Sequence, residues 1–126
     1  MRKYRRNRDA DVVSRMLRSR NGRIALFEND LELFGEYYFP HLFTDRLAEF
    51  QKQWLRSMSN MDVNTYIEAF RGSGKTIDAV ILVAWCICFK KRRYIMPYTY
   101  EKKKATANLY GLATQLMRNK KLIADF

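Results

Sequence analysis

A glycine-rich segment between two apolar segments constrains the fold of this chain more than any other feature. Residues 72–76 read Gly-Ser-Gly-Lys-Thr. Residues 63–70 precede them, are rich in β-branched and aromatic side chains, and are short enough for a strand. Residues 77–89 follow them and are apolar nearly all round, as in a helix buried among other elements. A strand, a glycine turn and a helix in this order predict a phosphate-binding loop.

The residue types of this motif explain how it would bind phosphate. Glycines let the backbone bend so that successive N–H groups point into one concavity and donate to phosphate oxygens. Lys75 would reach the β- and γ-phosphates, and the Thr76 hydroxyl would coordinate the Mg²⁺ ion that bridges them. The standard motif has a further glycine five residues before Gly74, where this chain has Ala69. Because the flanking elements are predicted independently, a nucleotide site is favoured over a chance glycine-rich turn.

Hydrophobic periodicity predicts four further elements. They are a helix within residues 24–43 that stops near Pro40, a helix over residues 45–58, a strand over residues 93–96 and a helix over residues 100–118. The order strand, helix, strand, helix implies a parallel crossover, and the predicted fold class is therefore α/β. Two parallel strands cannot make a sheet covered on both faces, so we expect the chain to be the front of a longer α/β domain.

Positive charge is concentrated at the N-terminus. The chain has 126 residues and a formal net charge of +11, which favours an anionic partner such as nucleic acid or nucleotide. Residues 1–23 hold nine Lys and Arg residues against Asp9 and Asp11, and a short apolar stripe predicts a helix there that ends near residues 21–22. This arm is interpreted either as a phosphate-binding or docking segment or as a solvated tail. The lysines at 102–104 form either a DNA-facing patch or a solvated helix face.

Composition argues against a membrane-spanning, a secreted and a zinc-dependent protein. The longest apolar run, residues 79–89, is well short of the roughly 20 residues that a membrane-spanning helix needs. The basic N-terminus is not followed by the apolar segment of a secretion signal. Cys86 and Cys88 are interpreted as buried reduced thiols, which fits a cytoplasmic location. With one His and no Cys pair at ligand spacing, a structural zinc site is not expected.

Several of these segments together resemble the large terminase subunits of tailed phages and prophages, the ATP-driven motors that package viral DNA. The phosphate loop of that family lacks the first glycine and carries a basic residue before Gly-x-Gly-Lys-Ser/Thr, as residues 69–76 do here. Residues 37–43, followed by Phe50 and Gln51, are similar to the family's segment ahead of the motor, in which an aromatic residue plus Gln or His contacts adenine. The family's first helix, second strand and following loop are similar to residues 85–89, 92–95 and 99–101.

The resemblance implies a P-loop NTPase core of the RecA/ASCE-like type with a mainly helical N-terminal extension. Residues 1–23 would be a basic N-terminal arm, and residues 24–126 an incomplete P-loop ATPase domain. The implied ligands are ATP and Mg²⁺, and the implied partners are double-stranded DNA, a small terminase subunit and a portal protein, with no membrane, in the cytoplasm of a host cell. The residues implied to bind ATP are Phe50, Gln51, Arg71, Gly72, Ser73, Gly74, Lys75 and Thr76. Of these, Arg71 and Lys75 are implied to be catalytic and Thr76 to bind the metal.

Two of these residues have interpretations that the sequence leaves open. Arg71 would either stabilise the developing charge on the γ-phosphate or pair with a surface acid. Gln51 would either read the adenine edge, with Phe50 or Trp54 stacking on the ring, or belong to an ordinary amphipathic helix.

The acidic residue that ATP hydrolysis needs is missing from the expected place. In this fold the acid ends a later apolar strand, but after Phe70 no apolar strand ends in paired acids. The nearest acids in sequence are Glu68 and Asp78. We therefore expect only a trace rate of ATP hydrolysis, and a truncated or split gene product. A helicase-like motor and a non-catalytic basic DNA-binding remnant are the alternatives.

Overall fold

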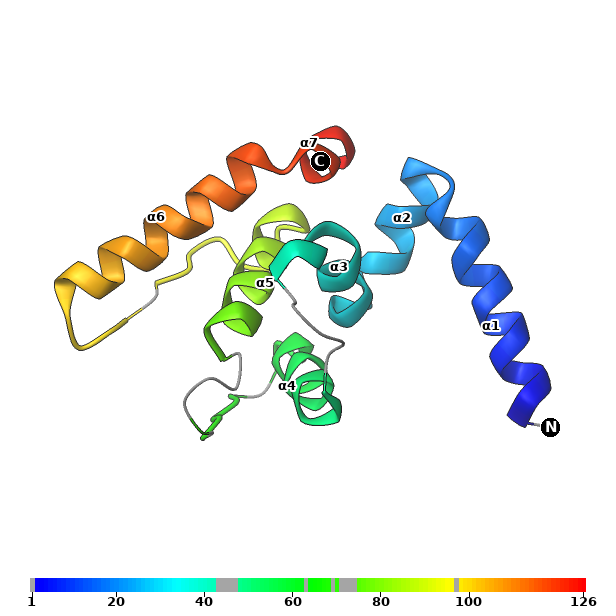
Figure 1. Ribbon diagram of the computed structural model, residues 1–126, viewed down its shortest axis with the longest axis horizontal. Coiled ribbons are helices and arrows are strands. Elements are labelled where there is room, and N and C mark those ends of the chain that lie inside the picture. Colours follow the sequence, from blue (N-terminus) through cyan, green and yellow to red (C-terminus); the bar gives the residue numbers. More distant parts are fainter. Residues whose placement is uncertain (1, 43–47, 63, 69, 71–74, 97) are drawn as a thin grey trace.

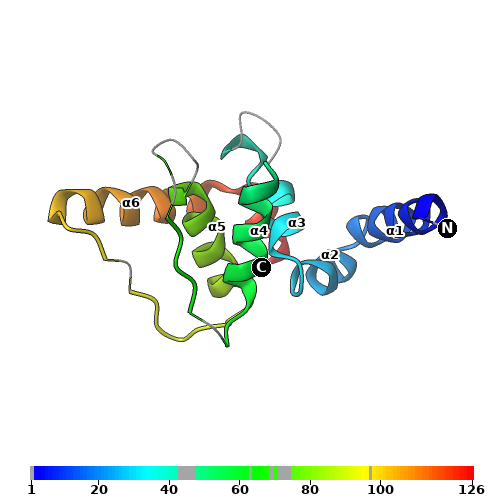
Figure 2. The ribbon, with the colours of Figure 1, turned by 90° about the horizontal axis from the view of Figure 1, so that it is seen from below.

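All regular secondary structure in the described part of the chain is helical. The computed structural model describes residues 2–42, 48–62, 64–68, 70, 75–96 and 98–126. The elements are α1 (Arg2–Leu17), α2 (Arg20–Phe27), α3 (Leu31–Tyr38), a 3-10 turn η1 (Pro40–Leu42), α4 (Glu49–Ser59), α5 (Lys75–Cys88), α6 (Lys102–Arg118) and α7 (Lys120–Asp125). Helices α3, α4 and α5 form a central cluster, from which α1 and α6 extend on opposite sides (Figure 1, Figure 2).

The predicted α/β fold, and with it the P-loop NTPase core, is wrong for the described residues. Neither residues 64–68 and 70 nor residues 93–96 form a strand. The side chains of Tyr66, Phe70 and Tyr94 are exposed, and only Ile95 of the second segment packs against the core, so neither segment has the covered faces of a buried strand. The tendency of β-branched and aromatic residues to form strands depends on packing against a pleated, half-buried surface, and these two segments with their exposed aromatic rings do not provide one.

Three of the predicted helices are present in the structure, in contrast to the predicted strands. The helices predicted for residues 77–89 and 100–118 are confirmed as α5 and α6. The helix predicted for residues 45–58 is confirmed from Glu49 onward, and residues 45–47 lie outside the described residues.

In the N-terminal arm a helix forms as predicted, but its predicted end near residues 21–22 is wrong. Helix α1 ends at Leu17, and Ser19 starts α2 by accepting a hydrogen bond from the Gly22 N–H at 3.0 Å. A second cap lies at Asp30, whose Oδ1 accepts the Leu33 N–H at 3.0 Å. Side-chain caps therefore divide residues 20–38 into two short helices.

One hydrophobic core joins five of the helices. Its buried members are Phe27, Leu31, Phe34, Tyr38, Phe39, Leu55, Ile81, Ala84, Trp85, Cys86 and Leu122. The Trp85 indole N–H donates to the Phe27 carbonyl at 2.8 Å. The polar group of this large core side chain therefore has a hydrogen-bond partner inside the protein. Helices α3 and α5 meet where Gly35 faces Ile81, and a Cβ at Gly35 would lie only 3.0 Å from Ile81 Cγ2. The absence of a side chain at Gly35 sets this close helix approach.

A buried carboxylate near the end of α7 ties the last helix to α2 and α3. Asp125 is 3% exposed and accepts both Nε and Nη2 of Arg23 at 2.7 Å, and the Tyr38 hydroxyl at 2.6 Å. The Arg23 guanidinium beside Asp125 holds the pKa of that carboxyl below its usual range. Arg20 Nε also donates to the Asp125 carbonyl at 2.9 Å, and the Asn119 side-chain amide donates to the Tyr38 carbonyl at 2.6 Å. Residues about one hundred positions apart are thus held together.

We expect Asp125→Ala to lower the free energy of unfolding by about 3 kcal/mol, because it leaves the Arg23 guanidinium without its bidentate partner. Asp125→Asn keeps one carbonyl oxygen and should cost less. Urea unfolding followed by circular dichroism measures both. Asp11→Ala, at an exposed helical position, is the control. A loss no larger for Asp125→Ala than for Asp11→Ala would contradict the assigned role of this ion pair.

Candidate functional site

The candidate phosphate-binding motif ends in the first turn of α5. This helix has 14 residues and begins at Lys75, the lysine of the motif. The first N–H groups of an α-helix have no partner within the helix, and the helix dipole makes its N-terminus attractive to anions. Thr76, the second helical residue, is exposed. Arg71, Gly72, Ser73 and Gly74, predicted to bind phosphate, lie outside the described residues.

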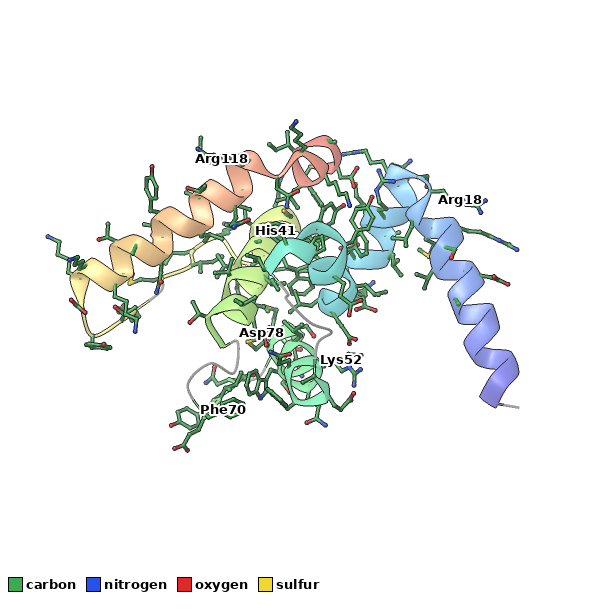
Figure 3. All side chains as sticks on the ribbon, viewed as in Figure 1. Arg18, His41, Lys52, Phe70, Asp78 and Arg118 are labelled. Atoms are coloured by element: carbon green, nitrogen blue, oxygen red, sulfur yellow. The ribbon has the colours of Figure 1, made fainter. Side chains whose placement is uncertain are left out.

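Helix α4 lies beside the point where the chain enters this motif. The Phe50 ring on α4 is 6.1 Å from the Phe70 ring, and residue 70 directly precedes Arg71. Phe50 also packs edge-on against Trp54, with ring centroids 5.0 Å apart. Phe70 lies close to α4 and near the beginning of α5 (Figure 3). The structure therefore brings Phe50, predicted to stack on adenine, next to the start of the motif.

Gln51, predicted to contact adenine, also has a role in the helix itself. Its Oε1 accepts the Ala48 N–H at 2.9 Å, which satisfies a backbone donor at the N-terminus of α4. The interpretation of Gln51 as part of an amphipathic helix is consistent with this bond. The adenine contact stays a prediction.

A buried carboxylate in the first turn of α5 was not expected from the sequence. Asp78 is 1% exposed, and neither of its oxygens has a hydrogen-bond partner among the described residues. It lies on the side of α5 toward α4 (Figure 3). The α4 residue Lys52 forms an ion pair with Glu32, with 3.6 Å between Nζ and Oε1. Burial raises the pKa of Asp78 to about 6. The signal in the sequence was that Asp78 is the only charged residue in the apolar run 77–89.

A mostly apolar pocket of about 320 Å³ lies between α5 and α6. Thr76 contributes to its wall from α5, and Asn108 does so from α6. Two cations, Arg92 and Arg93, also line the pocket. The remaining lining residues are Ala79, Val80, Val83, Ile87, Ile95, Leu109 and Leu112. The pocket reaches the first turn of α5 on a different face of the helix from Asp78, since Thr76 is exposed and Asp78 is buried.

Within the part of the chain that the structure describes, no group of three or more His, Cys, Asp or Glu residues is placed to hold a metal ion. None of its helices is both long and apolar enough to cross a membrane.

Comparisons with known proteins gave no match to this chain. No model of a protein family, no curated protein and no solved structure matched the chain.

The raised pKa of the buried Asp78 should make the folded state less stable as the pH rises from about 4 to about 6. The folded state keeps the Asp78 proton up to about pH 6, whereas the unfolded chain releases it near its ordinary pKa of 3.8. The contribution of Asp78 is therefore most favourable below about pH 4 and is lost as the pH rises to about 6. We expect Asp78→Asn to raise the free energy of unfolding by about 3 kcal/mol at pH 7 relative to the unsubstituted chain.

Urea unfolding at pH 4, 5, 6 and 7 measures this difference, because groups common to both chains cancel in the comparison. Asp62→Asn, at an exposed position, is the control. If the stabilities of the chain and of Asp78→Asn changed in parallel over this range, Asp78 would not carry the raised pKa.

Proposed function

We propose that this chain binds the phosphate groups of ATP at residues 71–76, and that it is the N-terminal ATP-binding portion of a DNA-packaging motor of the terminase type. The observation that carries the proposal is that α5 begins at Lys75, the lysine of the Gly-Ser-Gly-Lys-Thr motif. Phosphate then meets the helix N-terminus, where N–H donors and the helix dipole favour a negative charge. The proposal rests on this junction of motif and helix and not on a sheet.

The residues of the motif have distinct roles in this proposal. The N–H groups at the start of α5 donate to phosphate oxygens, and Lys75 contributes a positive charge to the β- and γ-phosphates. Arg71 neutralises charge on the γ-phosphate. Thr76, whose side chain is exposed, would hold Mg²⁺ through its hydroxyl, and the ion would neutralise phosphate charge there. Phe50, beside Phe70 at the start of the motif, offers a partly exposed ring to the adenine.

We propose binding with only trace hydrolysis for this chain. Hydrolysis needs an acid that polarises the attacking water or completes the magnesium shell. The buried acid nearest the motif in sequence, Asp78, is enclosed on the side of α5 toward α4, and its raised pKa keeps it partly protonated. Neither property suits a magnesium ligand.

The proposed partners follow from charge and from the terminase resemblance. Double-stranded DNA is the proposed polyanion, with the basic arm at residues 1–23 as its contact. A small terminase subunit and a portal protein are the proposed protein partners, and the cytoplasm of a host cell is the proposed location. A non-catalytic DNA-binding protein is the second candidate, because α1 is rich in arginine and exposes Arg15.

Removing the motif lysine should weaken ATP binding. Lys75→Ala removes the cation facing the β- and γ-phosphates and leaves the glycines in place, so we expect affinity to fall about 10- to 150-fold. Titration with a fluorescent ATP analogue in the presence of Mg²⁺ measures the affinity. Lys120→Ala, at an exposed position in α7, should bind like the unsubstituted chain. Equal affinity in the Lys75 and Lys120 variants would rule out the phosphate-loop interpretation.

Duplex DNA binding should depend on salt and on the arm. Each phosphate contact releases counterions, so each arginine that touches a phosphate adds about 0.9 to the slope of log affinity against log salt. We expect Arg5→Gln combined with Arg6→Gln to flatten this slope for a 20-base-pair duplex of arbitrary sequence. Arg118→Gln combined with Lys120→Gln removes the same charge at exposed positions far from the arm in sequence. A slope that changes equally in both double variants would show that only net charge matters.

A further inference from the structure

Three tyrosine side chains before and on α6 are largely exposed. Tyr98 and Tyr100 lie in the segment that leads into the helix and are 83% and 89% exposed, and Tyr110 on α6 is 77% exposed. Large aromatic rings usually contribute to a core or to a binding surface, since each offers a large apolar area.

Lysines lie between these tyrosines. Lys102, Lys103 and Lys104 form the first turn of α6 and are all exposed. Within residues 92–110 there are five Lys and Arg residues and a single acid, Glu101. Glu101 is the N-cap residue, and its side chain makes no capping hydrogen bond. The surface around the start of α6 is therefore strongly positive as well as aromatic.

A shallow hollow groups three of these side chains and a ring contact pairs two others, while Tyr98 takes part in neither. A shallow hollow on α6 is lined by Lys102, Lys103, Thr106, Ala107 and Tyr110. The Lys104 ammonium lies 5.4 Å from the centre of the Tyr100 ring, a cation–π arrangement. We call the set Tyr98, Tyr100, Lys102, Lys103, Lys104 and Tyr110 the tyrosine–lysine surface. It lies on the part of the chain that extends away from the central helices (Figure 1, Figure 2).

The dimensions of this surface suit a chain of nucleotides. Lys102 and Tyr110 are eight residues apart on α6, which corresponds to about 12 Å along the helix axis. A single strand can place a phosphate at one end of this span and an unstacked base at the other. Exposed rings beside a group of cations are the arrangement with which proteins hold single strands, because bases stack on the rings and phosphates contact the cations. In a duplex the bases are stacked on one another, so the rings would have nothing to bind.

We propose that the tyrosine–lysine surface binds single-stranded nucleic acid without sequence preference. The tyrosine rings stack on bases, and the lysines of the first turn of α6 contact the phosphates between them. This goes beyond the proposed ATP site and does not depend on it, because the surface shares no residue with the motif at residues 71–76.

The test measures binding of a fluorescein-labelled 20-nucleotide oligothymidine to the full chain by fluorescence anisotropy. We expect Tyr100→Ala combined with Tyr110→Ala to weaken binding about ten-fold or more, since the stacking of a base on an aromatic ring contributes substantially to the affinity of such complexes. Tyr100→Phe combined with Tyr110→Phe keeps the rings and should bind like the unsubstituted chain. Tyr66→Ala, which removes an equally exposed ring outside the surface, should have no effect.

Three further measurements separate this proposal from its competitors. Lys75→Ala should bind the oligothymidine normally, so failure of the ATP site would not affect the result. A duplex of the same length should be insensitive to loss of the two tyrosine rings. Vesicles of phosphatidylserine and phosphatidylcholine should not compete with the oligothymidine.

The proposal is overturned if loss of both rings leaves oligothymidine binding unchanged while circular dichroism shows the same helix content. It is also overturned if duplex binding falls by the same factor in that variant. Effective competition by the vesicles would assign the surface to a lipid headgroup layer instead.

Discussion

Helix α5 is apolar on nearly every side, and the rest of the structure is arranged around covering it. Its residues Ile81, Ala84 and Trp85 are buried in the core, with α3 approaching at Gly35 and α4 packing alongside. Burying apolar surface is the main favourable contribution to folding, and close packing is needed to realise it. The helices that surround α5 can leave their own outer faces polar or charged because this one helix supplies so much of the core.

The same helix explains two features of the candidate site. Asp78 is carried into the interior because it lies in an otherwise apolar helix that must be covered on the side of α4. On another face, α5 is covered only partly by α6, which leaves the pocket that extends from Thr76 to Leu112 and an Ile87 that is still exposed. The first turn of α5 therefore has a buried acid on one face and an open apolar pocket on another. The proposed phosphate site lies at the N-terminus of this turn.

The ion pair of Arg23 with Asp125 gives the basic arm a second role. In the sequence, Arg23 is one of the nine cations of residues 1–23, which predict either a phosphate-binding or docking segment or a solvated tail. In the structure its guanidinium is bound to Asp125 at 2.7 Å, and Tyr37 lies within 5.9 Å of the same cation. Arg20 is bound to the carbonyl of the same residue. The end of the arm is thus part of the packed structure, whereas α1 leads away from it.

By itself the sequence determined the helices whose apolar residues recur with helical period, the charge of the arm and the motif at residues 72–76, because these depend on local composition. It also placed a helix directly after the motif, which the structure confirms, although α5 begins at Lys75 and not at residue 77. Only the tertiary structure decided that residues 64–70 and 93–96 form no strand where they are described, since a strand needs a partner and a covering layer from elsewhere in the chain. The burial of Asp78, the exposure of Tyr98, Tyr100 and Tyr110, and the bond of Arg23 to Asp125 were likewise decided by packing. These properties depend on contacts between residues that are distant in sequence, so they cannot be predicted from a local pattern of side chains.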